Sequence, residues 1–199
     1  MWIWLMSSAF AAPPDDIRPV LAPLDAPDQY AEYMRSQGRS DVLACEPVWR
    51  DAALQCWKYG AGSWATRADL REWGTSHEAL VASTTERART ALAAGWTEVT
   101  VPGITGSYFE APDPDGLAHA AVFLPELLRQ VTGGQTVYVS APVEGVLLAW
   151  QPGNAELNHA IAVGARKMFD ASTSPSTPVV FQHTGRWVPF AEATPRGEP

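Results

Sequence analysis

The sequence has few cysteines, few basic residues and no long apolar run, and each shortage excludes a class of protein. Two cysteines among 199 residues cannot build a disulfide-rich scaffold. The 14 Lys and Arg residues are scattered and are outnumbered by 22 Asp and Glu, whereas nucleic-acid binding draws on clustered basic side chains. No apolar run reaches the roughly 20 residues that a transmembrane helix needs. The sequence therefore predicts neither a nucleic-acid partner nor a transmembrane segment.

Motifs for cofactors, metals and catalytic nucleophiles are also missing. No Gly-rich stretch precedes the Lys-Ser/Thr of a phosphate-binding loop, and no serine lies in a G-x-S-x-G elbow. No two histidines are four residues apart on one predicted helix, and the cysteines have no partner pair at zinc-ligand spacing. Asp113 and Asp115 resemble the start of a calcium loop, but no Glu follows at the twelfth position. We expect no cofactor and no metal.

The chain divides into four segments by composition. With 46% hydrophobic and 18% charged residues, it has the composition of a globular protein. Residues 1–11 are apolar and end in Ala9-Phe10-Ala11, the small-x-small pattern of a signal peptide, although no basic residue precedes them. The Pro- and Ala-rich residues 12–28 predict a spacer, 29–190 a single domain, and 191–199 a flexible tail. A signal peptide predicts a periplasmic or secreted protein, and an uncleaved apolar tail on a cytoplasmic protein is the alternative.

Cys45 and Cys56 are the only cysteines, eleven positions apart. In an oxidising compartment such a pair can form one disulfide, which would add about 2 to 3 kcal/mol of stability by closing a short loop. Two buried free thiols are the alternative. The predicted export signal favours the disulfide.

Helices and hairpins alternate along the chain. Capping residues open helices near Thr66, near Thr75-Ser76 and at Asn154, and a further helix is expected from Leu117 to Val131, where Pro125 must kink or split it. Strand pairs are expected at 54–58 and 62–65, 98–101 and 107–110, 136–141 and 145–150, and 178–183 and 186–190. This order predicts an α+β fold, in which an antiparallel sheet built from hairpins is joined by three main helices that pack mainly on one face, as a two-layer sandwich.

Two sets of side chains are candidates for a site. Asp115, His119 and His183 could form a hydrolase-like site at one edge of the sheet, although a surface or structural role is the ordinary one for each histidine. Trp57, Trp64 and Trp73 belong to an unusual total of nine tryptophans, and with Tyr108 they are candidates for a binding surface. Burial in the core is the ordinary fate of tryptophan.

Several short motifs between residues 57 and 190 occur in a recognisable order. Tyr108-Phe109 follows a glycine and precedes Asp115-Gly116 and an apolar helix. The strand from Val137 is followed by Pro142, an acidic turn and a second apolar strand. Two further motifs, near the two ends of this range, are Glu72-Trp73 and Gly185-Arg186-Trp187. In these motifs the chain resembles the YtpQ-like family of uncharacterised bacterial proteins, domains of unknown function. The resemblance implies no particular reaction or ligand, and the export signal and shorter N-terminus depart from the family pattern.

The predicted function is that of an exported, non-enzymatic binding or interaction domain whose partner is a protein or a cell-envelope component. The complete set of fold signals and the missing catalytic motifs support this hypothesis. The alternative is a small hydrolase-like enzyme that uses Asp115, His119 and His183. An intracellular regulatory protein is a third hypothesis.

Overall fold

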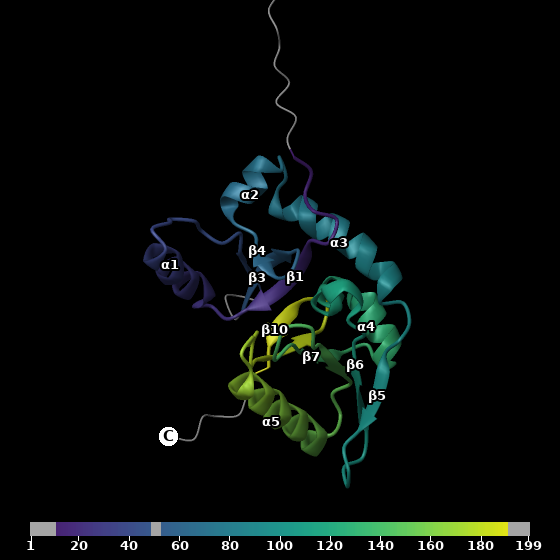
Figure 1. Ribbon diagram of the computed structural model, residues 1–199. Coiled ribbons are helices and arrows are strands. Elements are labelled where there is room, and N and C mark those ends of the chain that lie inside the picture. Colours follow the sequence, from purple (N-terminus) through teal and green to yellow (C-terminus); the bar gives the residue numbers. More distant parts are fainter. Residues whose placement is uncertain (1–10, 49–52, 191–199) are drawn as a thin grey trace, which may run out of the picture.

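The computed structural model describes residues 11–48 and 53–190, which form an α+β fold with two antiparallel sheets (Figure 1). The α+β prediction is confirmed, but the strands are divided between two sheets. The predicted tail at 191–199 and all but the last residue of the predicted signal peptide at 1–11 lie outside the described residues.

The first sheet lies in the N-terminal half of the chain. Strand β1 (Arg18–Ala22) pairs with β3 (Ala53–Tyr59), which also pairs with β2 (Glu46–Val48) and β4 (Ser63–Trp64). The spacer predicted at 12–28 is therefore wrong from Arg18 onward. Val20, Leu21 and Ala22 are buried, and helix α1 (Ala26–Ser36) starts inside the predicted spacer. Pro27 is compatible with helix α1 because it lies in the first turn, where a backbone N–H would have no acceptor within the helix.

The second sheet contains six strands in the order β10-β9-β7-β8-β6-β5, and every neighbouring pair is antiparallel. All three hairpins predicted in this half are confirmed. Their strands are β5 (Thr97–Thr100) with β6 (Ser107–Glu110), β7 (Val137–Ser140) with β8 (Leu148–Trp150), and β9 (Val180–His183) with β10 (Trp187–Pro189).

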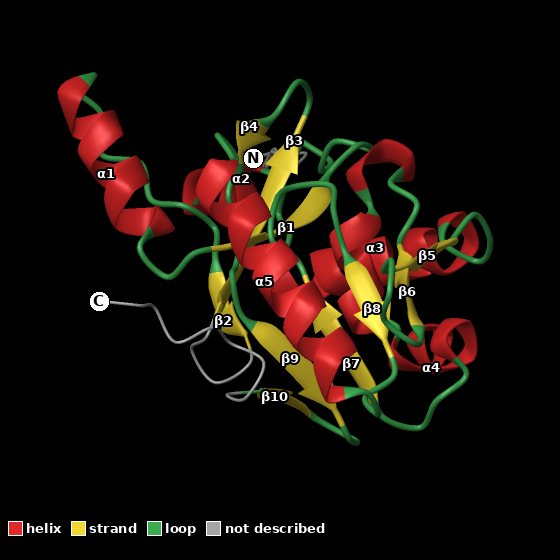
Figure 2. Cartoon of the chain, turned by 90° about the horizontal axis from the view of Figure 1, so that it is seen from below, coloured by secondary structure: helices red, strands yellow, loops and turns green. Residues whose placement is uncertain are grey.

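Helices cover both faces of this six-stranded sheet, so the prediction of helices mainly on one face is wrong. Val137 and Val139 pack on the side of α3 (His77–Ala91), η2 (Ala118–Phe123) and α4 (Pro125–Thr132). Tyr138, between them, packs on the opposite side against α5 (Ala155–Ala171). Figure 2 shows α5 lying in front of the sheet, beside β9 and β8. Hydrophobic side chains on both faces of one strand require cover on both sides.

The helix boundaries follow local signals. Asn154 caps α5 by accepting the N–H groups of Glu156 and Leu157, Ser76 caps α3, and Thr66 forms a capping box at α2 (Arg67–Glu72). As expected from Pro125, the predicted helix 117–131 is split into η2 and α4. The short η1 (Pro114–Gly116) precedes η2.

Cys45 and Cys56 form a disulfide, as predicted, with their sulfur atoms 2.00 Å apart. Cys56 lies on β3, and Cys45 immediately precedes β2. The bond therefore fastens the short strand β2 to the centre of the first sheet. Cys56 is buried beside Ala22 and Leu54, and Trp64 packs on the same cluster.

Candidate functional site

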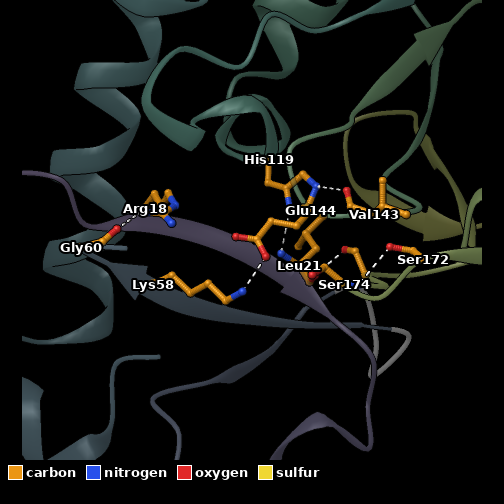
Figure 3. A network of polar contacts seen from close by, with 10 residues as sticks. Arg18, Leu21, Lys58, Gly60, His119, Val143, Glu144, Ser172 and Ser174 are labelled. Carbon is orange, nitrogen blue, oxygen red and sulfur yellow. Dashed lines mark hydrogen bonds and ion pairs between the residues drawn. The ribbon is translucent and has the colours of Figure 1, made fainter. Parts of the chain in front are cut away.

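His119 is a structural residue that joins the two sheets. Its Nδ1 accepts the Leu21 N–H at 3.1 Å, so the proton of the neutral ring is on Nε2, which points to the carbonyl oxygens of Val143 at 3.0 Å and Val146 at 3.2 Å. Figure 3 shows the ring between strand β1 and the loop at Val143. Burial lowers the pKa of His119, an effect that the two carbonyl contacts partly oppose. Because both ring nitrogens are engaged, neither is free to accept a proton from a substrate.

Strand β1 is an edge strand, and this junction covers its edge. The Ser176 hydroxyl donates to the Leu21 carbonyl oxygen, while His119 accepts the N–H of the same residue. The Lys58 Nζ lies 2.5 Å from a Glu144 carboxylate oxygen and adds an ion pair between the sheets (Figure 3). Polar groups of β1 that could otherwise pair with a foreign strand are thus satisfied inside the molecule.

Asp115 and His119 line one polar cavity of about 410 Å³, together with Arg18, Asp113 and Glu144. His183 has different neighbours. Its Nδ1 lies 3.3 Å from Arg129 Nη2 of α4, and its ring stacks edge-on with Trp187 of β10. Burial and the Arg129 charge lower the pKa of His183. The structure therefore brings Asp115 close to His119 but gives His183 a separate environment.

The predicted aromatic candidates have different environments. Trp57 is fully buried, and its indole N–H donates to His77 Nδ1 at 3.0 Å, so the prediction of Trp57 as a surface binding residue is wrong. Trp73 is partly buried and packs edge-on against Tyr59. Tyr108 packs against the buried cluster that contains Tyr138 of β7 and Leu157 of α5. Trp64 lines two cavities.

Both cavities lie beside helix α1, which projects from the body of the molecule (Figure 2). Met34 is its one buried residue, and Tyr33 is 61% exposed. Tyr30, Tyr33 and Trp64 line both cavities and form the boundary between them. We call the two together the α1 groove.

The apolar cavity of the groove has a volume of about 380 Å³. Its floor is the face of β1 that carries Val20 and Ala22, above the cluster that contains the disulfide. The Lys58–Glu144 ion pair closes one side, and the Lys58 ammonium lies 4.3 Å from the centre of the Trp64 ring. The remaining lining residues are Pro23, Ala26, Gln29, Leu43, Thr173, Ser174 and Pro175.

The aromatic cavity of the groove has a volume of about 560 Å³. Tyr59 adds a fourth ring to the three shared ones, and Arg39, Asp41 and Asp69 supply its charges. Burial raises the pKa of Tyr30, and the carboxylates of Asp41 and Asp69 raise it further. The Tyr59 pKa is raised in the same way, by burial first and then by Asp69 and Glu72.

Tyr30 and Tyr33 are site residues that the candidate sets did not include. The amphipathic pattern of residues 29–37 places two tyrosines three positions apart, which on a helix puts them on one face. That spacing was the available signal. It could not reveal that Trp64 and Tyr59, which are distant in sequence, complete the groove.

Within the described ranges, no three His, Cys, Asp or Glu side chains gather closely enough to hold a metal ion. No helix among these residues is long and apolar enough to cross a membrane. Comparisons with family models, curated proteins and solved structures give no match to this chain.

Proposed function

We propose that this protein is a non-enzymatic binding domain and that the α1 groove is its ligand site. The observation that carries the proposal is the set of three aromatic side chains, Tyr30, Tyr33 and Trp64, shared by two adjoining cavities. The apolar cavity, at about 380 Å³ and lined by aromatic and aliphatic side chains with a few polar groups, is typical of small-molecule sites. Aromatic side chains also supply contact area at low entropic cost.

The state of the histidines favours binding over hydrolysis. A general base needs a nitrogen within reach of a substrate proton, and both nitrogens of His119 already contact backbone groups. His183 contacts Arg129, whose positive charge opposes protonation of the ring. A hydrolase that used Asp115, His119 and His183 would require both rings to leave these partners.

We also propose that the protein is exported and acts in the periplasm or outside the cell. The intramolecular disulfide supports this location because such bonds persist in oxidising compartments. The apolar N-terminal residues with Ala9-Phe10-Ala11 support it independently. Membership of the YtpQ-like family stays a prediction, and a cell-envelope component is the partner class that fits an exported binding domain.

The ligand site can be tested by a nuclear magnetic resonance screen of sugars, amines, amphiphiles and short peptides against the wild-type protein and Tyr33→Ala. Tyr33 is exposed, so its truncation should leave the fold intact. Met168→Ala, an exposed apolar side chain on α5 that lines neither cavity, is the matched control. We expect ligands that shift the signals of groove residues and bind more weakly to Tyr33→Ala alone. Turnover of a screened compound that is lost in Asp115→Asn would overturn the proposal in favour of the hydrolase.

Export has its own test. The complete chain is expressed in a bacterial host, and the N-terminal residue of the purified protein is determined. We expect the mature chain to begin after Ala11. Retention of Met1 to Ala11 in cytoplasmic protein would contradict export without affecting the groove.

A further inference from the structure

We propose that the aromatic cavity of the α1 groove binds a weakly hydrated organic cation, such as a free quaternary ammonium compound. This inference rests on the proposed function and specifies its ligand class. It follows from the combination of aromatic rings and net negative charge in one cavity.

Four rings from three elements line the cavity. Tyr30 and Tyr33 come from α1, Tyr59 from the end of β3, and Trp64 from β4. The faces of aromatic rings carry negative electrostatic potential, and they attract alkylammonium groups that lose little hydration on binding. Primary ammonium groups hydrate more strongly, so a cavity of this kind favours methylated amines.

The charges of the cavity have the sign that a cation needs. Asp41 and Asp69 contribute two negative charges and Arg39 one positive charge, which leaves one net negative charge. Burial is the main cause of the raised pKa values of Tyr30 and Tyr59, and the nearby carboxylates, which disfavour the phenolate form, raise them further. Outside the cavity, Lys58 lies over the Trp64 ring, but Glu144 neutralises its charge.

Asp41 is the carboxylate best placed to exchange partners. One Asp69 oxygen accepts the N–H and the hydroxyl of Thr66 in the capping box, which fixes this side chain to the start of α2. Asp41 instead pairs with Arg39, whose Nη2 lies 2.5 Å from its Oδ2 and whose side chain is 63% exposed. An exposed guanidinium can move into water at little cost. Arg39 is therefore an internal cation with which a bound cation would compete.

The test compares two probes of nearly the same shape on the wild-type protein by calorimetry. Choline carries the quaternary ammonium, and 3,3-dimethylbutan-1-ol replaces its nitrogen by carbon and is neutral. We expect choline to bind at least about ten-fold more tightly than the neutral alcohol, since cation–π contacts in partly desolvated sites are worth that much. Binding of choline should weaken as salt is added, because a charge interaction contributes.

Variants locate the site and test the exchange with Arg39. Tyr33→Ala should weaken choline binding about ten-fold, while Tyr33→Phe, which keeps the ring, should stay within about two-fold of wild type. Asp41→Asn should weaken binding, and Arg39→Gln should strengthen it by removing the internal competitor. Thermal unfolding of each variant verifies that the fold is retained.

The outcomes separate this inference from the proposed function. Equal binding of choline and the alcohol, or unchanged affinity in Arg39→Gln and Asp41→Asn, overturns the cation site and leaves the groove as an apolar binding site. Binding to phosphatidylcholine vesicles without binding of free choline overturns the free ligand in favour of a lipid headgroup. If no compound in the wider screen depends on Tyr33, the proposed function itself fails.

Discussion

Replacement of His119 by alanine should be among the most destabilising single changes in this protein. The truncation leaves the buried Leu21 N–H without its acceptor and removes the donor to the Val143 and Val146 carbonyls. An unsatisfied buried polar group costs about 1 to 3 kcal/mol, and the lost ring adds the cost of a cavity. We expect the free energy of unfolding to fall by about 3 to 5 kcal/mol. The exposed His159 is the control, since His159→Ala should change stability by less than about 0.5 kcal/mol.

The cost of this substitution should also depend on pH. Burial lowers the pKa of His119 in the folded protein, whereas the unfolded chain has an ordinary value of about 6.5. The unfolded state therefore binds a proton more readily, and the stability contributed by neutral His119 is complete above about pH 6.5 and decreases as the pH falls below it. His77 and His183, whose pKa values are also lowered, affect wild type and variant alike. The difference between wild type and His119→Ala should therefore shrink from pH 7.5 to pH 5.

The assay is urea unfolding followed by circular dichroism at several pH values, with wild type, His119→Ala and His159→Ala measured together. A loss below about 1 kcal/mol at pH 7.5 would contradict the structural role, since three backbone contacts could not then depend on the ring. A loss that is the same at every pH would show that the folded protein does not keep His119 neutral.

Two further predictions concern the disulfide and a glycine. The double variant Cys45→Ser, Cys56→Ser should lose about 2 to 3 kcal/mol of stability, a loss measured by thermal unfolding, and wild type should lose a similar amount in reductant whereas the variant should not respond to it. Gly106→Ala should cost more than Gly38→Ala. Both glycines have a positive φ, 110° and 71°, but a Cβ at Gly106 would lie 2.9 Å from Cδ2 of Leu157, which is packed in the core, and one at Gly38 would meet nothing within 4 Å. Backbone strain of about 1 kcal/mol is common to both, so equal losses in urea unfolding would refute the Leu157 contact.

Local signals identified most of the elements in the second half of the chain. Asn154 caps α5, Pro125 splits the predicted helix, and alternating strands flank the turn after Ala141. These features act within a few residues and can be read from sequence. The strand Arg18–Ala22 could not be identified in this way, because it is buried by distant partners: β3 in its sheet, and His119 and Ser176 at its outer edge.

The candidate site could likewise be predicted only in part from the sequence. The sequence identified Trp64 as a binding candidate and paired the two cysteines, and the spacing of Tyr30 and Tyr33 on one helix face was present in it. It also selected His119, but as a catalytic candidate, because a histidine's role depends on what its two nitrogens contact. Those contacts join residues about 24 to 98 positions apart.

By itself, then, the sequence determined the α+β class, the helix caps, the hairpins and the chemistry available for a disulfide. The tertiary structure decided how the strands divide between two sheets, which faces the helices cover, and that Tyr30, Tyr33, Tyr59 and Trp64 meet beside α1. The physical reason is the distance along the chain over which each kind of interaction acts. Capping, turn and periodicity signals arise from neighbouring residues, whereas burial and cavity lining arise from packing between segments far apart in the chain.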